Sequence, residues 1–493
     1  MPRIVLFLIV IAAMGSPKES FAQTTSSRSF SITDRGGVSV VTSGDRGTLA
    51  VGYARIQTTA GTTPAGFAVY GLRQGGVLVS ETGVPATPLI QNGRIYAEES
   101  ATVDTGVAIA NPNAQTAVIN FSFTDAAGST FGSGQTTIAA NGQMAKFLSE
   151  APFNSGRSLQ GTFSFSSNVP VGVIALRGLI NQRGEFLITT LPVIDTSVTI
   201  SGPTSVLSHF ADGGGWKTQV VLVNPSDTTK TGSVVFFNQG LTFGSANPIS
   251  MTVNGQGGLS FPYNIPPRGA VRLSTSGLGD ATVVGSVRIN GDPNQSLPSA
   301  IGVFSLTTAG ITVTEAGVPA LAATSLRLYA ETTAAGNESG AIQTGIAVSN
   351  LGSSAGSITF ELYGLDGSFT GQTASRQIAG NGQVALFFHE LFPAPVVQYP
   401  FRGIVRIVSS GPEISAVGLR GRYNERREFL ITTTPPSRET GTASTAEMVF
   451  PHIVDSGGYT TQFVLYSGIS GQTSGGNLNL FSQTGQALVL TFQ

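Results

Sequence analysis

Short runs in which apolar and small polar residues alternate fill the chain. Residues 117–123 (AVINFSF) and 161–165 (GTFSF) alternate, whereas 171–176 (VGVIAL) and 186–190 (FLITT) are denser in apolar residues. A period of two is typical of a half-buried β-strand. Clusters of Asn, Gly, Pro and Asp separate the runs, so that about seven short strands fall in about 100 residues. The pattern predicts an all-β chain of tandem immunoglobulin-like antiparallel β-sandwiches.

A block of about 240 residues occurs twice. Residues 209–216 (HFADGGGW) match residues 452–459 (HIVDSGGY), and residues 176–190 match residues 419–433 at the same offset. A β-propeller is the alternative repeat architecture, but its blades repeat about every 40–50 residues. That period is less than half the spacing found here, so the repeats favour sandwiches.

Each block divides into two related units, X and Y, because residues 105–112 (TGVAIANP) resemble residues 218–225 (TQVVLVNP). Proline- and serine-rich stretches between the units predict linkers. The predicted boundaries are a signal peptide at 1–22, the second half of a Y unit at 29–87, an X unit at 94–193, a Y unit at 206–320, an X unit at 327–436, and the first half of a Y unit at 448–493.

The two halves of a Y unit lie at opposite ends of the chain. A half sandwich exposes a sheet face and unpaired strand edges, which favours aggregation. Three alternatives follow. The halves pair within one molecule and close a ring of domains, they pair between molecules and cause self-association, or the chain is truncated.

The N-terminus predicts export. Arg3 precedes an apolar run of about eleven residues, which is too short to span a bilayer but suits the core of a signal peptide cleaved before Gln23. The chain has no cysteine, which excludes a lipoprotein anchor and disulfides, and no later segment predicts a membrane span. We therefore expect a periplasmic or extracellular protein.

Charged side chains are sparse, at 11% of residues with a formal net charge of −1. No cluster of Lys and Arg predicts a nucleic-acid partner, and a weakly charged surface leaves self-association open. The three histidines are dispersed and no acidic Ca²⁺ loop is present, so we expect no metal site and no cofactor.

Residues 209–216 are the first candidate for chemistry. Asp212 could orient His209 as a base, or Trp216 could stack on a sugar. The other interpretation is a glycine turn leading into a strand, with Trp216 as a core aromatic. The second copy favours the turn, because Tyr459 replaces Trp216 as one core aromatic replaces another.

Arg177 and Arg420 begin the densest recurring cluster of charges, since each is followed by an Asn-x-Arg-x-Glu sequence. One interpretation is a hairpin turn with Arg and Glu paired across it. The other is a small polar ligand patch that occurs twice. His389, the third histidine, is replaced by Ser149 in the other copy, and we expect a surface or turn role for it.

Four strings, GGGWKTQVVLVNP, VTEAGVPA, GLRGRYNERREFLITTTPP and GGYTTQFVLYSG, resemble those of uncharacterised secreted repeat proteins of environmental bacteria. The resemblance implies secretion and a repeat architecture, with no activity attached.

No nucleophile, base and oxyanion donor converge in the sequence, so we expect no enzyme. The expected function is a non-catalytic structural, adhesive or assembly role at the cell surface or matrix. The alternative is an extracellular carbohydrate- or ligand-binding protein, with a polysaccharide as one candidate partner. Its candidate contact residues are Trp216, Tyr459, His209, Asp212, Arg177 and Arg420.

Overall fold

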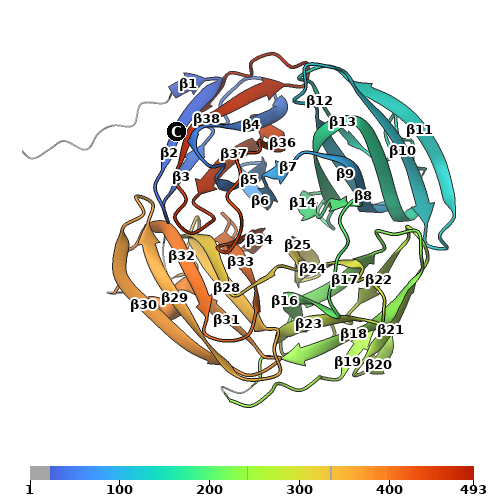
Figure 1. The fold of residues 1–493 in the computed structure, drawn as a ribbon, viewed down its shortest axis with the longest axis vertical. Coiled ribbons are helices and arrows are strands. Elements are labelled where there is room, and N and C mark those ends of the chain that lie inside the picture. The colour runs from blue at the N-terminus through green and yellow to red at the C-terminus, as the bar shows by residue number, and fades with distance from the viewer. Residues whose placement is uncertain (1–22, 157, 241–242, 334–335, 395) are drawn as a thin grey trace, which may run out of the picture.

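Four β-sandwiches surround a central axis in a computed structural model of the chain (Figure 1). The structure describes residues 23–156, 158–240, 243–333, 336–394 and 396–493; the predicted signal peptide lies outside them. The prediction of an all-β fold is confirmed. Within the described residues, the helix α1 (Phe388–Leu391) is a single turn, and no helix has the length and apolar character needed to cross a membrane.

Sandwich 1 is built from both ends of the chain. In one sheet β38 lies between β2 and β4, and in the other β37 lies between β3 and β5. The two halves of a Y unit therefore pair within one molecule, which is the first of the three alternatives, and the blue and red ends of the chain meet in Figure 1. The strands are β2 (Ser27–Ile32), β3 (Gly37–Val41), β4 (Ala50–Gly61), β5 (Ala65–Gln74), β6 (Val77–Pro85), β7 (Thr87–Pro88), β36 (Met448–Asp455), β37 (Tyr459–Tyr466) and β38 (Ser474–Ser482), with β1 (Gln23–Thr25) paired to β39 (Leu490–Phe492).

Sandwich 2 has its two sheets joined by one long strand. The first half of β13 pairs with β8 and β10, and its second half pairs with β9 and β14. The strands are β8 (Ile90–Glu99), β9 (Val103–Ala110), β10 (Ala117–Asp125), β11 (Thr130–Ile138), β12 (Gln143–Phe147), β13 (Leu159–Ile180), β14 (Phe186–Leu191) and β15 (Ile194–Asp195).

Sandwich 3 consists of the sheets β16-β23-β18-β21 and β22-β17-β24-β25, with a small hairpin β19-β20. The strands are β16 (Thr204–Asp212), β17 (Trp216–Val223), β18 (Lys230–Asn238), β19 (Met251–Val253), β20 (Gln256–Gly258), β21 (Phe261–Ile265), β22 (Ala270–Ser274), β23 (Val283–Gly291), β24 (Ser299–Thr308) and β25 (Ile311–Pro319).

Sandwich 4 consists of the sheets β30-β29-β32-β27-β35 and β26-β33-β28-β31, with β34 paired to β33. The strands are β26 (Ala322–Ala323), β27 (Ser325–Thr332), β28 (Ile342–Asn350), β29 (Gly356–Gly364), β30 (Phe369–Ile378), β31 (Gln383–Phe387), β32 (Phe401–Ser409), β33 (Ile414–Tyr423), β34 (Phe429–Thr434) and β35 (Ser437–Arg438).

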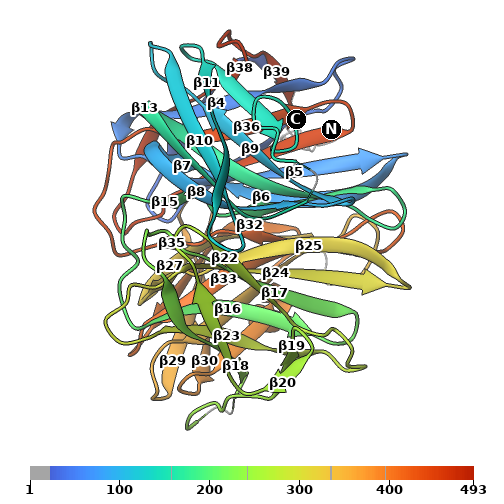
Figure 2. The same ribbon diagram turned by 90° about the vertical axis from the view of Figure 1, so that its right-hand side faces the viewer.

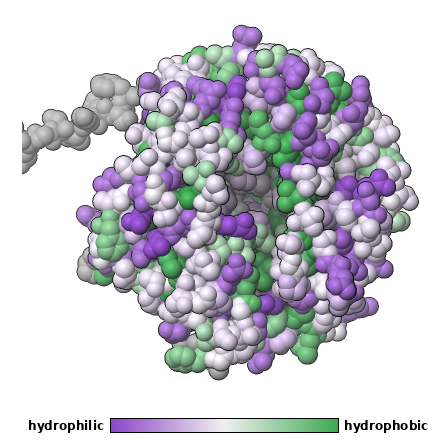
Figure 3. All heavy atoms as spheres, viewed as in Figure 1, coloured by the Kyte–Doolittle hydropathy of each residue, from purple (hydrophilic) through white to green (hydrophobic). Residues whose placement is uncertain are grey.

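Four strands, one from each sandwich, meet at the axis: β6, β14, β25 and β34. Hydroxyl groups join them, since Thr190 donates to the carbonyl oxygen of Gly83 (2.8 Å) and Thr314 donates to that of Ile431 (3.0 Å). Figure 2 shows the hairpins β5–β6 and β24–β25 reaching to the same side of the ring. On the face in Figure 3, hydrophilic and hydrophobic residues are intermixed and the surface is hollowed near the centre.

Each sandwich buries its own apolar core, as the alternating sequence pattern requires, and further apolar clusters cross between neighbours. One cluster joins sandwiches 4 and 1 around Phe67, Tyr329 and Tyr466. Another joins sandwiches 3 and 4 around Phe304, Leu419 and Ile431. Burial of aromatic and aliphatic side chains contributes about 1.5–3 kcal/mol each, so these clusters hold the ring closed as well as folded.

Candidate ligand-binding sites

Two kinds of interface alternate around the ring, and the candidate residues divide between them. The interfaces from sandwich 2 to 3 and from 4 to 1 carry buried ion pairs. The interfaces from sandwich 1 to 2 and from 3 to 4 each contain a pocket. This alternation follows from the duplicated block, because each X unit faces a Y unit on either side.

Arg177 lies in the interface between sandwiches 2 and 3. Its guanidinium group pairs with Glu315 of sandwich 3 and, at 3.3 Å, with Glu98 of its own sandwich. Arg272 of sandwich 3 also binds Glu98, at 2.6 Å. Arg177 is only 5% exposed, so its charge joins two sandwiches and offers no surface to a ligand.

Arg420 makes the matching contacts between sandwiches 4 and 1. It pairs with Glu331 of its own sandwich and with Glu81 of sandwich 1, and it is equally buried. One difference between the two neighbourhoods is Arg422, at the position of Leu179 in the first copy, which adds a second cation beside Glu81, at 2.9 Å. Among the described residues, Glu315 therefore pairs with one cation and Glu81 with two.

The recurring Asn-x-Arg-x-Glu sequences form hairpin turns, as the simpler interpretation predicts. The side-chain oxygen of Asn181 accepts hydrogen bonds from the backbone N–H groups of Arg183 (2.9 Å) and Glu185 (3.0 Å). Beyond that prediction, Arg183 also pairs with Glu428 of the other copy, at 2.6 Å. The two turns thus bind each other, and they link sandwiches 2 and 4.

The glycine run after Asp212 forms a turn, which the second copy favoured. Gly213, Gly214 and Gly215 all have positive φ, and a Cβ on Gly213 would lie 2.4 Å from the carbonyl oxygen of Ala281. The Asp212 carboxylate accepts a hydrogen bond from the backbone N–H of Gly277 (2.8 Å). Asp212 therefore holds a neighbouring loop and does not touch His209 as an orienting partner.

Trp216 is not a core residue of its own sandwich. It is half-buried and lines a pocket of about 320 Å³ between sandwiches 3 and 4, with its ring 5.6 Å from that of Phe304. The prediction of a core aromatic is corrected here, because Trp216 opens strand β17 at the end that faces sandwich 4. The rest of the pocket comes largely from sandwich 4, including Ala385, Phe387 and Phe429.

His209 lines the same pocket and is neutral. Burial lowers its pKa to about 4. Its Nδ1 lies 3.1 Å from the side-chain nitrogen of Gln383, and that nitrogen also faces the carbonyl oxygen of Ser208 (3.4 Å). The amide nitrogen of Gln383 can only donate, so it donates to both the Ser208 carbonyl oxygen and His209 Nδ1. Nδ1 is therefore the acceptor, and the neutral imidazole carries its proton on Nε2. Among the described residues, Nε2 has no hydrogen-bond partner, so it is left as a donor.

A matching pocket of about 330 Å³ lies between sandwiches 1 and 2. His452 takes the place of His209, and burial lowers its pKa to about 4 as well. Its Nδ1 lies 3.4 Å from the side-chain nitrogen of Gln143. Tyr459 and Tyr70 occupy the positions of Trp216 and Phe304. We call these two cavities the twin pockets.

The twin pockets share most of their lining but differ in charge at one position. Phe147 and Phe186 in one correspond to Phe387 and Phe429 in the other, and a glutamate, Glu150 or Glu390, lies at each. Where Leu386 lines one pocket, the other has Lys146, which lies 3.8 Å from Glu150. Apolar side chains form most of the walls of both pockets, and few polar groups interrupt them.

Several pocket residues were not among the sequence candidates. The phenylalanines of β12 and β31 recur at matching places, as do Gln143 and Gln383, which face the pocket histidines, and this recurrence was the available signal. It did not identify a site, because Gln383 is 174 positions from His209 and Gln143 is 309 positions from His452. His389 lies beside this region, with its ring stacked on Phe387 at 5.8 Å.

No protein-family model and no curated protein matches the sequence. Among solved structures, the crystal structure of Thermotoga maritima 1070 is 13% identical over 22% of this chain and 96% of its own, with a TM-score of 0.19. A structure of the infectious bursal disease virus T13 particle is 12% identical over 83% of this chain and 78% of its own, with a TM-score of 0.13. The archaeal virus protein with a triple jelly roll fold has 10% identity over 83% of this chain and 91% of its own, also with a TM-score of 0.13. At such TM-scores these likenesses carry no argument about function.

Proposed function

We propose that this chain is a non-catalytic, exported binding protein whose twin pockets each take one small, largely apolar aromatic ligand. The observation that carries the proposal is that both pockets occur at matching places although their residues differ. Trp216 corresponds to Tyr459, Phe304 to Tyr70 and Leu386 to Lys146, yet the volumes are about 320 and 330 Å³. A gap left by poor packing would not keep its size through such exchanges.

The lining indicates the class of ligand. Aromatic rings and aliphatic side chains make up most of each wall, and the imidazole Nε2–H is one of the few donors there, a combination that suits an aromatic ring carrying a hydrogen-bond acceptor. A sugar would leave most of its hydroxyl groups without partners against such walls, at a cost for each unpaired group. We therefore favour an aromatic ligand over a polysaccharide, the candidate partner of the alternative function.

The sole tryptophan provides the test, because Trp216 lines one pocket and Tyr459 occupies its place in the other. The uncharged fluorophore N-phenylnaphthylamine absorbs where tryptophan emits, so binding in the Trp216 pocket transfers energy to it. We expect transfer in the wild type and also in a Trp216→Phe/Tyr459→Trp variant, which moves the reporter to the other pocket.

Pocket-filling variants supply the matched controls. Ala385→Phe fills the Trp216 pocket and should abolish transfer from Trp216, whereas Ala145→Phe, at the matching position of the other pocket, should leave it intact. Absence of transfer from both reporters, or equal transfer in Ala385→Phe, would overturn the proposed function.

A structural or adhesive role is the second candidate, and the outer edges of the ring favour it. The edge strands β11 and β30 each have one neighbour, and each exposes a phenylalanine, Phe131 (38%) and Phe369 (51%). β11 contains no charged residue and no proline, the residues that usually block edge-to-edge pairing. Self-association through this edge predicts a concentration-dependent sedimentation coefficient that Ser133→Lys, in the middle of β11, removes. A coefficient independent of concentration would contradict it.

A further inference from the structure

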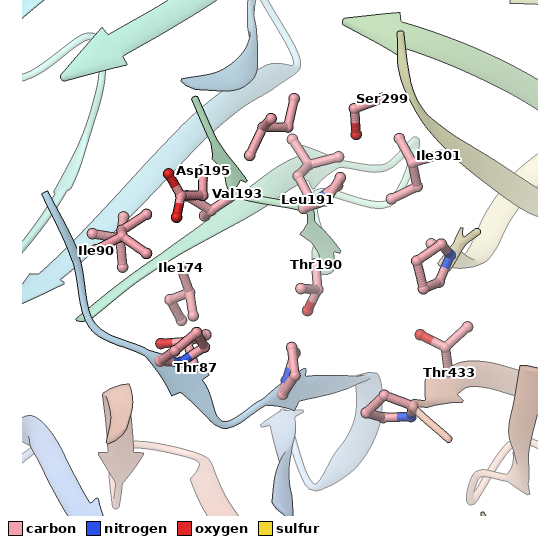
Figure 4. A pocket seen from close by; sticks show the side chains of 18 of the residues that line it. Thr87, Ile90, Ile174, Thr190, Leu191, Val193, Asp195, Ser299, Ile301 and Thr433 are labelled. Carbon is pink, nitrogen blue, oxygen red and sulfur yellow. The ribbon is translucent and has the colours of Figure 1, made fainter. Parts of the chain in front are cut away.

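A third cavity, of about 550 Å³, opens on the axis of the ring, and we call it the axial cup (Figure 4). All four sandwiches contribute equivalent residues to it. Each axial strand ends in or just before a proline, and these four prolines line the cup: Pro85, Pro192, Pro319 and Pro435. The residues two positions earlier line it as well: Gly83, Thr190, Gly317 and Thr433. Residues two apart share one face of a strand, so all four strands turn the same face towards the cup.

Most of the remaining wall is aliphatic. Figure 4 shows Ile174, Leu191 and Ile301 around the cavity; the first two belong to sandwich 2 and the third to sandwich 3. Among the described residues that line the cup, none is aromatic. This separates the cup from the twin pockets, whose walls carry four aromatic side chains each, the histidines aside.

The charge of the wall restricts the ligand further. Asp195 is the sole ionisable side chain among the described lining residues, and its carboxylate accepts hydrogen bonds from the backbone N–H (2.9 Å) and hydroxyl (2.6 Å) of Ser197. A ligand carboxylate would therefore meet an anion and no cation. Such a wall disfavours a fatty acid relative to an uncharged chain of the same length.

We propose that the axial cup binds an uncharged aliphatic chain, such as that of an alkanol, and that it does so independently of the twin pockets. The volume lies within the usual range of ligand cavities, about 300–1,000 Å³. The rigid prolines keep the cavity open, because their fixed φ and missing N–H prevent the axial strands from pairing further at this end.

Calorimetric titration of the protein with octanol and with octanoate at pH 8 tests the proposal. We expect octanol to bind at least tenfold more tightly than octanoate. Asp195→Asn, which keeps the oxygen that accepts from Ser197, should strengthen octanoate binding and leave octanol binding unchanged. Equal binding of the two compounds, or no binding of octanol, would overturn the proposal.

Two variants locate the site. Val193→Phe fills the cup, and Val198→Phe does so from a position that is 59% exposed, where folding is not at risk. Either should weaken octanol binding at least tenfold, whereas Ala145→Phe/Ala385→Phe, which fills the twin pockets, should leave it unchanged. The opposite pattern would place octanol in the twin pockets and refute a separate site. Since the twin pockets are followed with an aromatic probe, failure of one proposal leaves the other intact.

Discussion

Replacement of Arg177 by Met should destabilise the ring far more than the same replacement of Arg420. Met keeps the length of the side chain and removes the charge. In Arg177→Met, Glu315, which is 6% exposed between two sandwiches, loses the one cation that it contacts among the described residues. In Arg420→Met, Glu81 keeps Arg422 at 2.9 Å.

The magnitudes follow from burial and pairing. Breaking a buried ion pair and leaving one charge alone costs about 3–5 kcal/mol. Loss of one hydrogen bond to a charged group that keeps another partner costs about 1.5–3 kcal/mol. Burial raises the pKa of Glu315 even beside Arg177. Without that cation the pKa rises further, so the carboxyl is tolerated when protonated, and stability is lost as the pH rises through the folded-state pKa.

Urea unfolding followed by circular dichroism and Trp216 fluorescence at pH 5 and pH 8 measures both effects. The deficit of Arg177→Met should be larger at pH 8 than at pH 5, and a second change, Glu315→Leu, should restore most of the stability, because it removes the unpaired carboxylate. Equal losses in the Arg177 and Arg420 variants, or a deficit in Arg177→Met that does not change with pH, would refute this account of the interface.

Three further outcomes are expected. Burial lowers the pKa of His209 and His452 to about 4, against about 6.5 in the unfolded chain, so the free energy of unfolding should be highest above pH 6.5 and fall towards pH 4, by about 3 kcal/mol for His209. A double His→Phe variant should lose this part of the pH dependence in urea titrations, and an unchanged profile would contradict the prediction. Asn224→Ala should lower the free energy of unfolding by about 2–4 kcal/mol, since the fully buried amide donates to three backbone carbonyl oxygens and its oxygen accepts from one N–H. A urea midpoint equal to that of the wild type would show that these hydrogen bonds do not stabilise the fold. Gly83→Ala should lower the urea midpoint of unfolding, because the new Cβ would lie 1.9 Å from the carbonyl oxygen of Thr433 at the axis. Gly47→Ala, whose Cβ would have nothing within 4 Å, should leave the midpoint unchanged. Equal midpoints for the two variants would argue against close packing at the axis.

The local alternation of residues and the internal repeats were enough to predict the strands and the complementary half units. Alternating runs predicted strands, and the matched halves of a Y unit allowed the two ends to pair, because complementary pieces of one sandwich are visible in one sequence. Three alternatives stayed open at that stage, since the choice between pairing within and between molecules depends on where the ends lie in space.

The contacts between sandwiches could not be predicted from the sequence. Arg177 was recognised as a recurring charge, but Glu315 lies 138 positions away, and only the ring brings them together. Trp216 matched the pattern of a core residue because a pocket wall and a core are both apolar. The exchange of Leu179 for Arg422 is visible in the aligned repeats, whereas its effect on a glutamate of another sandwich is not.

Closure of the ring by the two ends of one chain is the central claim, because the pocket at His452, the interface at Arg420 and the axial cup all depend on it. Ser27 and Asn479 lie opposite each other in β2 and β38, with their side-chain oxygens 2.5 Å apart, and the chain has no cysteine of its own. In Ser27→Cys/Asn479→Cys, mild oxidation followed by non-reducing electrophoresis and sedimentation should give a disulfide-closed monomer. Disulfide-linked dimers and larger species, or two thiols that stay free, would contradict the closed ring.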